Sequence, residues 1–198
     1  MSVATMPEPD ILALFRHSGA LLNGHFRLSS GLHSSGYLQC ALVLQHPQHA
    51  EALGRAIADL TREWRPSVVL SPALGGVVIG HEVARALGAR ALFAERQDGA
   101  LTLRRGFVIG ETDRVLVVED VLTTGGSTRE TMQVARAAGG QVVGAASIVD
   151  RGGKNRPAFD VPFAALIEVD LPTYEPSSCP LCGQGLPVIK PGSRPVAT

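Results

Sequence analysis

Two adjacent carboxylates follow an apolar run in the middle of the chain. The run is residues 115–118, and Glu119 and Asp120 come directly after it. Neighbouring carboxylates repel each other unless cations or hydroxyl groups compensate their charge. Divalent magnesium and the hydroxyls of a sugar are the usual partners of such a pair. The pair therefore predicts a site for a ligand that carries a diol and a metal ion.

A segment rich in hydroxyl groups and glycine, residues 123–127, follows the acid pair and precedes a predicted helix. Glycine allows backbone N–H groups to converge on an anion, hydroxyls add donors, and the helix N-terminus adds partial positive charge. A phosphate site beside a diol site indicates a phosphorylated sugar as the ligand. Ser127 and Glu130 also fit a capping box, which needs no ligand and is compatible with a phosphate site.

Apolar runs and helical patterns alternate along the chain around this segment. The apolar runs are residues 68–70, 91–93, 115–118, 141–149 and 163–169. The helical patterns are residues 8–18, 49–64, 77–87 and about 127–138. Continuous apolar strands that alternate with helices indicate a parallel sheet covered on both faces, so the predicted fold class is α/β. Ligands of such sheets bind outside the carboxyl ends of the strands, where the acid pair lies.

Composition and missing motifs limit the other function classes. The chain has 198 residues, which suits one domain, and 18 basic residues balance 18 acidic ones. Binding to nucleic acid or to an anionic membrane normally requires a basic excess, so neither partner is expected. We find no bilayer-spanning run, no basic N-terminal signal region and too few cysteines for a disulfide scaffold, and therefore expect a cytoplasmic protein. Neither a Walker-type phosphate loop nor a Gly-x-Gly-x-x-Gly dinucleotide motif occurs.

Residues 115–127, Val-Leu-Val-Val-Glu-Asp-Val-Leu-Thr-Thr-Gly-Gly-Ser, resemble the 5-phospho-α-D-ribose 1-diphosphate (PRPP) signature of type I phosphoribosyltransferases. The resemblance implies a central, mostly parallel sheet flanked by helices, with a small N-terminal hood and a flexible loop. It also implies a homodimer, and a Mg²⁺ ion bound mainly through the diphosphate of PRPP. Glu119 and Asp120 would hold the ribose hydroxyls. The implied PRPP site continues through Val121, Leu122, Thr123, Thr124, Gly125, Gly126 and Ser127.

Other segments resemble the orotate phosphoribosyltransferases within this family. Residues 30–34 and 37–39 resemble the hood that closes over the base, and residues 148–151 resemble an Asp-Arg pair whose arginine meets the orotate carboxylate. The C-terminal stretch 179–194 resembles that of a bacterial branch of these enzymes. Arginine suits a carboxylate because its planar guanidinium binds through two hydrogen bonds. The implied orotate site comprises Thr123, Arg151, Ser29, Tyr37 and Leu38.

Residues 71–76 resemble the family's pyrophosphate loop, a glycine-rich turn after a strand. Ala73, Leu74 and Gly75 would present backbone N–H groups to phosphate oxygens. In relatives this loop can carry a non-proline cis peptide, which we expect near Ala73 and Leu74 here. Considered without the resemblance, the segment is a simple strand-to-helix turn.

A basic segment, residues 95–107, lies where the family has a flexible loop that closes over the diphosphate and excludes water. Many relatives have lysine and histidine there, and this chain has neither. The resemblance implies a catalytic role for Arg96 beside the acid pair, with Arg104 and Arg105 as substitutes. Without the resemblance, the segment predicts a two-stranded arm with solvated arginines, which could also reach a partner subunit.

Departures from the family pattern leave alternatives open. Ser29 and Gly75 stand where many orotate enzymes have lysine, which weakens direct anion contacts and leaves room for another base. Without the resemblance, Arg151 is better explained as a surface arginine paired with Asp150 or Asp160. The alternatives are a purine or uracil phosphoribosyltransferase, and a non-catalytic PRPP-sensing regulator that binds RNA or DNA. The main prediction is transfer of ribose 5-phosphate to orotate, giving orotidine 5′-monophosphate and diphosphate in UMP biosynthesis.

The predicted single domain consists of a base-binding hood, a PRPP-binding core and an irregular tail, at residues 1–48, 49–170 and 171–198. In the tail, Cys179 and Cys182 form half of a zinc site. No histidine follows His81, and Cys40 is distant in sequence, so a tetrahedral set would need a second chain or spatial neighbours. We therefore expect two thiols in a turn and no metal ligands from the protein.

Overall fold

A six-stranded sheet forms the centre of the protein, for which the computed structural model describes residues 8–28, 30–153, 156 and 158–190. The strand order is β5-β4-β3-β6-β7-β8, and all neighbours pair in parallel except β4 and β5. The strands are β3 (Val68–Pro72), β4 (Arg90–Gln97), β5 (Ala100–Leu103), β6 (Arg114–Leu122), β7 (Gln141–Asp150) and β8 (Phe163–Glu168). The predicted α/β class and each predicted apolar strand are therefore confirmed.

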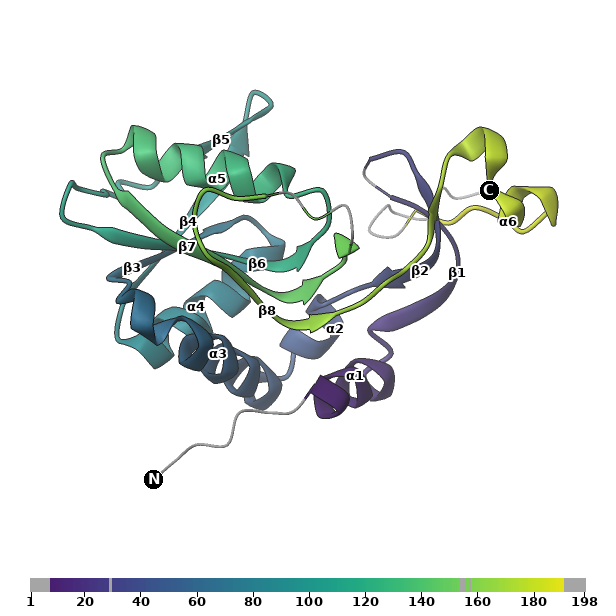
Figure 1. Ribbon diagram of the computed structural model, residues 1–198, viewed down its shortest axis with the longest axis horizontal. Coiled ribbons are helices and arrows are strands. Elements are labelled where there is room, and N and C mark those ends of the chain that lie inside the picture. The colour runs from purple at the N-terminus through teal and green to yellow at the C-terminus, as the bar shows by residue number, and fades with distance from the viewer. Residues whose placement is uncertain (1–7, 29, 154–155, 157, 191–198) are drawn as a thin grey trace.

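Helices cover both faces of this sheet. Figure 1 shows α5 on one side and α3 and α4 on the other. Alternation along β3 explains the two layers, since Val69 packs with the α3 and α4 side and its neighbours Val68 and Leu70 pack with Ala135 of α5. All four of these side chains are fully buried. The helices are α1 (Glu8–His17), α2 (Ala41–Leu44), α3 (Pro47–Thr61), α4 (Gly75–Leu87), α5 (Gly126–Ala137) and α6 (Pro180–Gly183).

A smaller three-stranded sheet forms the hood, with the order β1-β2-β9. Its strands are β1 (Leu21–Arg27), β2 (His33–Leu38) and β9 (Thr173–Tyr174). The C-terminal segment returns to this sheet, because the Ile189 N–H donates to the carbonyl of His25 at 2.8 Å and the Ile189 carbonyl accepts from the Arg27 N–H at 2.9 Å. Figure 1 shows α6 beside β1 and β2. The tail expected to be irregular thus contributes a strand and a short helix to the hood.

No helix within the described ranges is both long and apolar enough to cross a bilayer.

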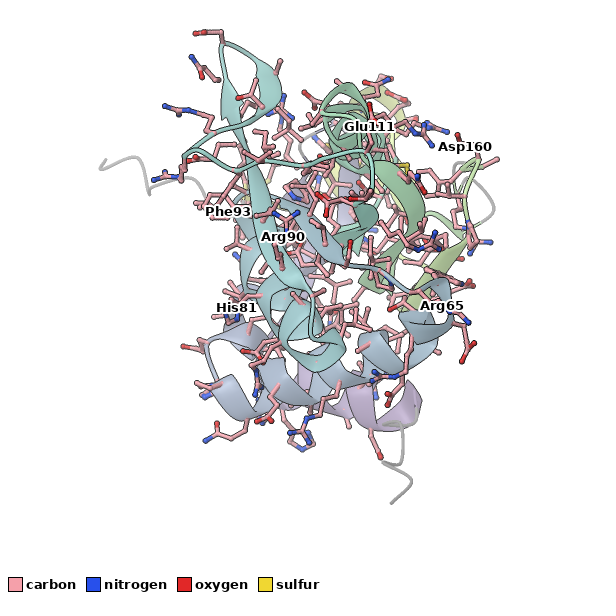
Figure 2. All side chains as sticks on the ribbon, turned by 90° about the vertical axis from the view of Figure 1, so that its left-hand side faces the viewer. Arg65, His81, Arg90, Phe93, Glu111 and Asp160 are labelled. Carbon is pink, nitrogen blue, oxygen red and sulfur yellow. The ribbon has the colours of Figure 1, made fainter. Side chains whose placement is uncertain are left out.

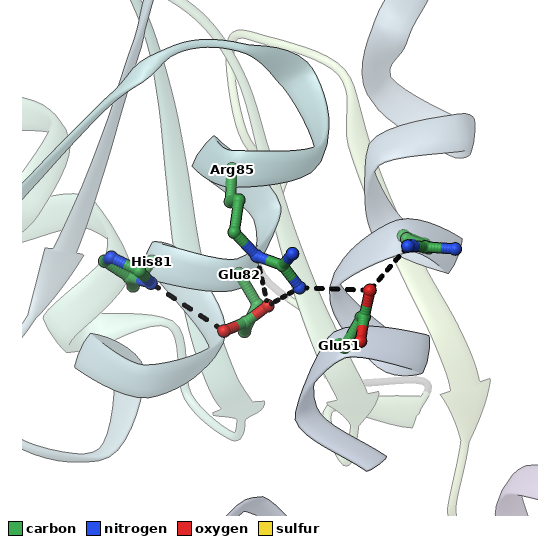
Figure 3. A network of polar contacts seen from close by, with 5 residues as sticks. Glu51, His81, Glu82 and Arg85 are labelled. Carbon is green, nitrogen blue, oxygen red and sulfur yellow. Dashed lines mark hydrogen bonds and ion pairs between the residues drawn. The ribbon is translucent and has the colours of Figure 1, made fainter. Parts of the chain in front are cut away.

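The helix pair α3 and α4 packs closely where α3 carries glycine. A β-carbon on Gly54 would lie 2.5 Å from the Glu82 β-carbon and 2.8 Å from its carbonyl carbon. Around this contact, Arg85 pairs with Glu82 at 2.6 Å and with Glu51 at 3.3 Å (Figure 3). These ion pairs are solvated and add little stability. The buried apolar side chains of the two helices, which pack in one cluster, hold them together, and glycine allows the close approach.

We expect Gly54→Ala to lower the free energy of unfolding by about 1–3 kcal/mol, because the added methyl group forces the two helices apart. Arg55→Ala is the matched control, since its side chain is 55% exposed on the same helix and should change stability little. Urea denaturation of both variants measures the difference. A Gly54→Ala variant as stable as the wild type would show that the helices can separate freely.

Candidate active site

The acid pair lies at the carboxyl end of β6, and its two carboxylates point to opposite sides of the strand. Thr128 in the first turns of α5 donates its hydroxyl to Glu119 Oε2 at 2.5 Å. On the other side, a β-carbon on Gly75 at the start of α4 would lie 2.9 Å from both carboxylate oxygens of Asp120. Adjacent strand residues alternate in direction, so one carboxylate meets each helix layer. The pair therefore joins the two glycine-rich turns that follow β3 and β6.

Burial shifts the acidity of both carboxyl groups. Desolvation raises the pKa of Glu119 from 4.5 to about 7, the Thr128 hydroxyl opposes this shift, and the Asp120 charge adds to it. Burial also raises the pKa of Asp120, and the backbone N–H of Val121, 2.9 Å from Oδ1, acts against the rise. Perturbed carboxyl groups at the end of a strand are typical of functional sites. Each of these groups becomes more stable as an anion when positive charge or hydroxyl donors arrive.

The predicted phosphate segment forms the turn between β6 and α5. Gly125 is the N-cap of α5 with a φ of 70°, a conformation that favours glycine, and the helix begins at Gly126. Thr123, Thr124 and Gly126 are exposed, so the segment is open to a ligand. The first N–H groups of a helix have no acceptor within it and point toward an anion placed there.

The capping-box interpretation of Ser127 is wrong. Ser127 lies inside the helix, and Glu130 accepts hydrogen bonds from Leu101 N–H at 2.6 Å and from Arg96 Nη2 at 2.9 Å. Gly125 takes the N-cap position because the turn needs a positive φ there. Glu130 thus connects α5 to strands β4 and β5.

The predicted pyrophosphate loop follows β3 and contains the expected cis peptide between Ala73 and Leu74. Leu74 is 86% exposed, and Gly75 and Gly76 form the first turn of α4 over the end of β6. A β-carbon on Gly76 would lie 3.0 Å from the carbonyl oxygen of Val118. At Gly75, a side chain would require the Asp120 carboxylate to shift.

Arg151 follows β7 and is partly buried beside the hood. Its backbone N–H donates to the carbonyl of Leu122 at 2.8 Å, which places it next to the end of β6. Its Nη2 donates to the Ser34 hydroxyl at 3.3 Å, while its Nε is buried and has no hydrogen-bond partner among the described residues. Burial lowers the pKa of this guanidinium. A buried donor without a partner is costly, so the side chain suits an anionic ligand that supplies one.

The surface pairing considered for Arg151 is wrong. Asp150 pairs with Arg156 at 3.2 Å, and Asp160 pairs with Arg136 at 2.7 Å. The hood instead holds the guanidinium, because Ser34 is fully buried and its hydroxyl donates to the carbonyl of Pro172 at 2.9 Å.

Tyr37 on β2 lies close enough to Asp120 of the acid pair for the two groups to interact electrostatically. Burial raises the pKa of its hydroxyl, the charges of Asp120 and Cys40 raise it further, and Arg151 lowers it. The phenol therefore lies in the electrostatic field of both the acid pair and the arginine. Of the remaining predicted base contacts, Leu38 packs in the core, and Ser29 lies outside the described residues.

Two residues of the predicted PRPP segment face the core rather than the ligand side. Leu122 is 1% exposed, and Val121 packs against the main core cluster. Their contribution to a ligand site is therefore through the backbone.

The basic segment forms the two-stranded arm that β4 and β5 build, as the residues alone suggested. Arg96 contacts Glu130 of α5, and Arg105 donates two hydrogen bonds of 2.7 Å to Glu95. Phe93, labelled in Figure 2, stacks edge-on against Phe107 with ring centroids 5.2 Å apart. Arg104 is exposed. The arm thus extends beyond the end of the sheet at which the acid pair lies, and the contact of Arg96 with Glu130 joins it to α5.

Sequence reasoning missed Thr128, Ser34 and the role of Glu130. Thr128 lies one residue beyond the signature, and its spacing from a strand-end carboxylate could have indicated the contact. Ser34 stands in the hood segment that resembles the family, yet its partner Arg151 is 117 residues away in the chain. Such a contact depends on how the hood folds back over the core.

Comparisons with known proteins identify the family of this chain. The family model described as a phosphoribosyl transferase domain matches residues 41–161. Orotate phosphoribosyltransferases from Pelotomaculum thermopropionicum and Heliobacterium modesticaldum are 52% and 51% identical over 191 residues, which cover 96% of this chain and 100% of each relative. The crystal structure of Mycobacterium tuberculosis H37Rv orotate phosphoribosyltransferase matches with a TM-score of 0.67 and 28% identity, over 81% of this chain and 96% of that one.

Because the folded-state pKa of Glu119 is about 7, above its ordinary value of 4.5, ionisation of this group opposes folding as pH rises through that window. We expect Glu119→Gln to stabilise the protein at pH 8 by on the order of 1–3 kcal/mol, with the gain vanishing toward pH 4.5. Thermal unfolding across this pH range measures the effect.

Asp113→Asn is the matched control with the opposite sign. The N–H of Gly110 and then the Arg90 guanidinium lower the pKa of Asp113 from 3.8, so its charge stabilises the fold above that pH. Its removal should destabilise the protein at pH 8. A Glu119→Gln variant that loses stability at pH 8 would contradict the desolvation of Glu119.

Proposed function

Because the chain belongs to the orotate phosphoribosyltransferase family, we propose that it transfers the ribose 5-phosphate group of PRPP to N1 of orotate. The products are orotidine 5′-monophosphate and diphosphate, which makes this a pentosyl transfer in pyrimidine biosynthesis. The observation that carries the proposal is Arg151, a partly buried guanidinium next to the strand that holds the acid pair, whose Nε finds no hydrogen-bond partner in the part of the chain that the structure describes. It is placed to receive the carboxylate of orotate while the ribose lies at Glu119 and Asp120.

The acid pair favours the transition state of this transfer. Orotate N1 forms a bond to the anomeric carbon as the bond from that carbon to the diphosphate oxygen breaks, and positive charge develops on the ribose ring. Glu119 and Asp120 accept hydrogen bonds from the ribose hydroxyls and stabilise that charge, most strongly because their surroundings are desolvated. Orotate bound as its N1 anion needs no general base.

The remaining groups hold the two phosphate ends. Backbone N–H groups and hydroxyls of residues 123–127 bind the 5′-phosphate at the N-terminus of α5. The turn of Ala73, Leu74 and Gly75 presents backbone donors to the diphosphate, and Arg96 with Arg104 or Arg105 supplies positive charge from the arm. The negative charge that develops on the leaving diphosphate is the demand these groups meet.

Mg²⁺ suits this site because the carboxylates of the protein and the phosphates of PRPP offer oxygen ligands, which a hard cation prefers. We propose that the ion arrives with PRPP, held mainly by the diphosphate next to Glu119 and Asp120, and neutralises charge on the leaving group. We further propose a cytoplasmic homodimer. The β4 and β5 strands lie at the edge of the six-stranded sheet (Figure 1), and we propose that the arm they form contacts the partner.

The test offers PRPP and Mg²⁺ to the protein with orotate, uracil, adenine or xanthine, and measures diphosphate release. We expect release with orotate and none above background with the three other bases, because a neutral base gains nothing from a partly buried guanidinium. Asp120→Asn should lower turnover with orotate by about 100-fold while the circular dichroism spectrum is unchanged. Release with adenine or uracil instead would assign the chain to another base.

Arg151→Ala should raise the KM for orotate by about 10- to 100-fold and leave the KM for PRPP within about twofold, because the lost bonds are charge-assisted and contact the base alone. Arg136→Ala, which removes a surface arginine paired with Asp160, is the control and should change neither constant. Equal increases in both KM values would show that Arg151 does not contact orotate.

A further inference from the structure

Four metal-binding side chains meet where the hood contacts the C-terminal segment. They are His25 of β1, His33 of β2, Cys179 just before α6 and Cys182 within it, and their ligand atoms all lie within 4.8 Å of one another. The two histidines and Cys179 are buried, and both cysteines are free thiols. All four residues lie outside the segment that the phosphoribosyl transferase model matches.

The sulfur–nitrogen distances within this cluster are those of a tetrahedral zinc site. Zn–S bonds of about 2.3 Å and Zn–N bonds of about 2.0–2.1 Å at the tetrahedral angle place sulfur and nitrogen about 3.5 Å apart. Cys179 Sγ lies 3.5 Å and Cys182 Sγ 3.7 Å from His25 Nε2, and Cys182 Sγ lies 3.4 Å from His33 Nδ1. The two nitrogens, 2.9 Å apart, need to separate by a few tenths of an ångström.

The hairpin places both histidines on one face of the hood. His33 pairs with Arg27 across the antiparallel strands, and His25, two residues before Arg27, has its Nε2 2.9 Å from His33 Nδ1. The register shifts between Asn23 and Phe26, which turns this end of β1 toward the tail. The rings lie edge to face with centroids 4.7 Å apart.

The tail supplies the sulfurs from a short turn and also orients one histidine. Cys179 is the N-cap of α6 and Pro180 its first residue, so the Cys-x-x-Cys spacing brings both sulfurs to one side. His25 Nδ1 lies 2.8 Å from the carbonyl oxygen of Leu186. A ring that donates Nδ1–H to a carbonyl keeps the Nε2 lone pair for a metal, which is the usual arrangement around zinc.

We propose that His25, His33, Cys179 and Cys182 bind a structural Zn²⁺ ion. Nε2 of His25, Nδ1 of His33 and two thiolates complete four-coordination, so no position is left for a substrate, and the two thiolates neutralise the charge of the ion. Binding releases the two thiol protons to solvent. The site fixes the tail to the hood next to Ser34, the neighbour of His33 that holds Arg151.

The test measures the zinc content of the tag-free protein by inductively coupled plasma mass spectrometry after dialysis against metal-free buffer. We expect about one zinc per chain and, after replacement by Co²⁺, the visible absorption of a tetrahedral site with thiolate ligands. Cys179→Ser with Cys182→Ser, and separately His25→Ala with His33→Ala, should lose the zinc. Cys40→Ala and His81→Ala, which change a cysteine and a histidine outside the cluster, should keep it.

Wild-type protein alone decides the outcome if the variants do not fold. Zinc far below one per chain after expression in zinc-supplemented medium would overturn the proposal, and so would a Cys179–Cys182 disulfide found by thiol alkylation and mass measurement. A strong chelator should lower the melting temperature of the wild type and leave that of the double cysteine variant unchanged. None of these measurements depends on transfer to orotate, so they test the metal site separately from the proposed function.

Discussion

Burial opposes ionisation of the two carboxyl groups at the end of β6, and the rest of the site is arranged around that penalty. Glu119 and Asp120 have raised pKa values because neighbouring elements partly bury and desolvate them. Among the described residues, Glu119 accepts from the Thr128 hydroxyl, and Asp120 is stabilised by the backbone N–H groups of Val121 and of Asp120 itself, which leaves acceptor capacity on both carboxylates for a ligand. A ligand that brings hydroxyl hydrogens and positive charge recovers the lost solvation. The stable core below, built from fully buried residues of β3 and β6, makes this local instability tolerable.

Glycine at the start of α4 is the steric condition for this arrangement. Gly75 and Gly76 bring the first turn of the helix against Asp120 and the Val118 carbonyl, where a β-carbon would lie 2.9–3.0 Å from these oxygens. A longer side chain at Gly75 would have to displace the Asp120 carboxylate. Glycine at this position lets the helix start and the Asp120 carboxylate lie in contact.

Local patterns in the sequence were sufficient for the core and for part of the site. Alternating apolar runs predicted the parallel sheet, and the motif at residues 115–127 predicted which strand end carries the acids. These local patterns did not predict the contacts between distant segments, because such contacts depend on how the tail returns over the hood. Arg151 pairs with Ser34 rather than with the nearby aspartates, and His25 meets Cys179 across 154 positions of sequence. The N-cap of α5 was misassigned because a positive φ at Gly125 outweighs the capping preference of serine.

Arginine carries nearly all of the positive charge in this chain, since Lys154 and Lys190 are its lysines among 18 basic residues. A guanidinium in a bidentate pair is held in one orientation, whereas an ammonium moves freely at the end of a flexible stem. Arg105 on Glu95 and Arg96 on Glu130 are held in this way before any ligand arrives. Any anion that binds these two arginines must compete with Glu95 and Glu130 for them. Glu130 of α5 also accepts a hydrogen bond from the Leu101 N–H of β5. A change in the pair between Arg96 and Glu130 therefore alters a contact that holds β4 and β5 against α5.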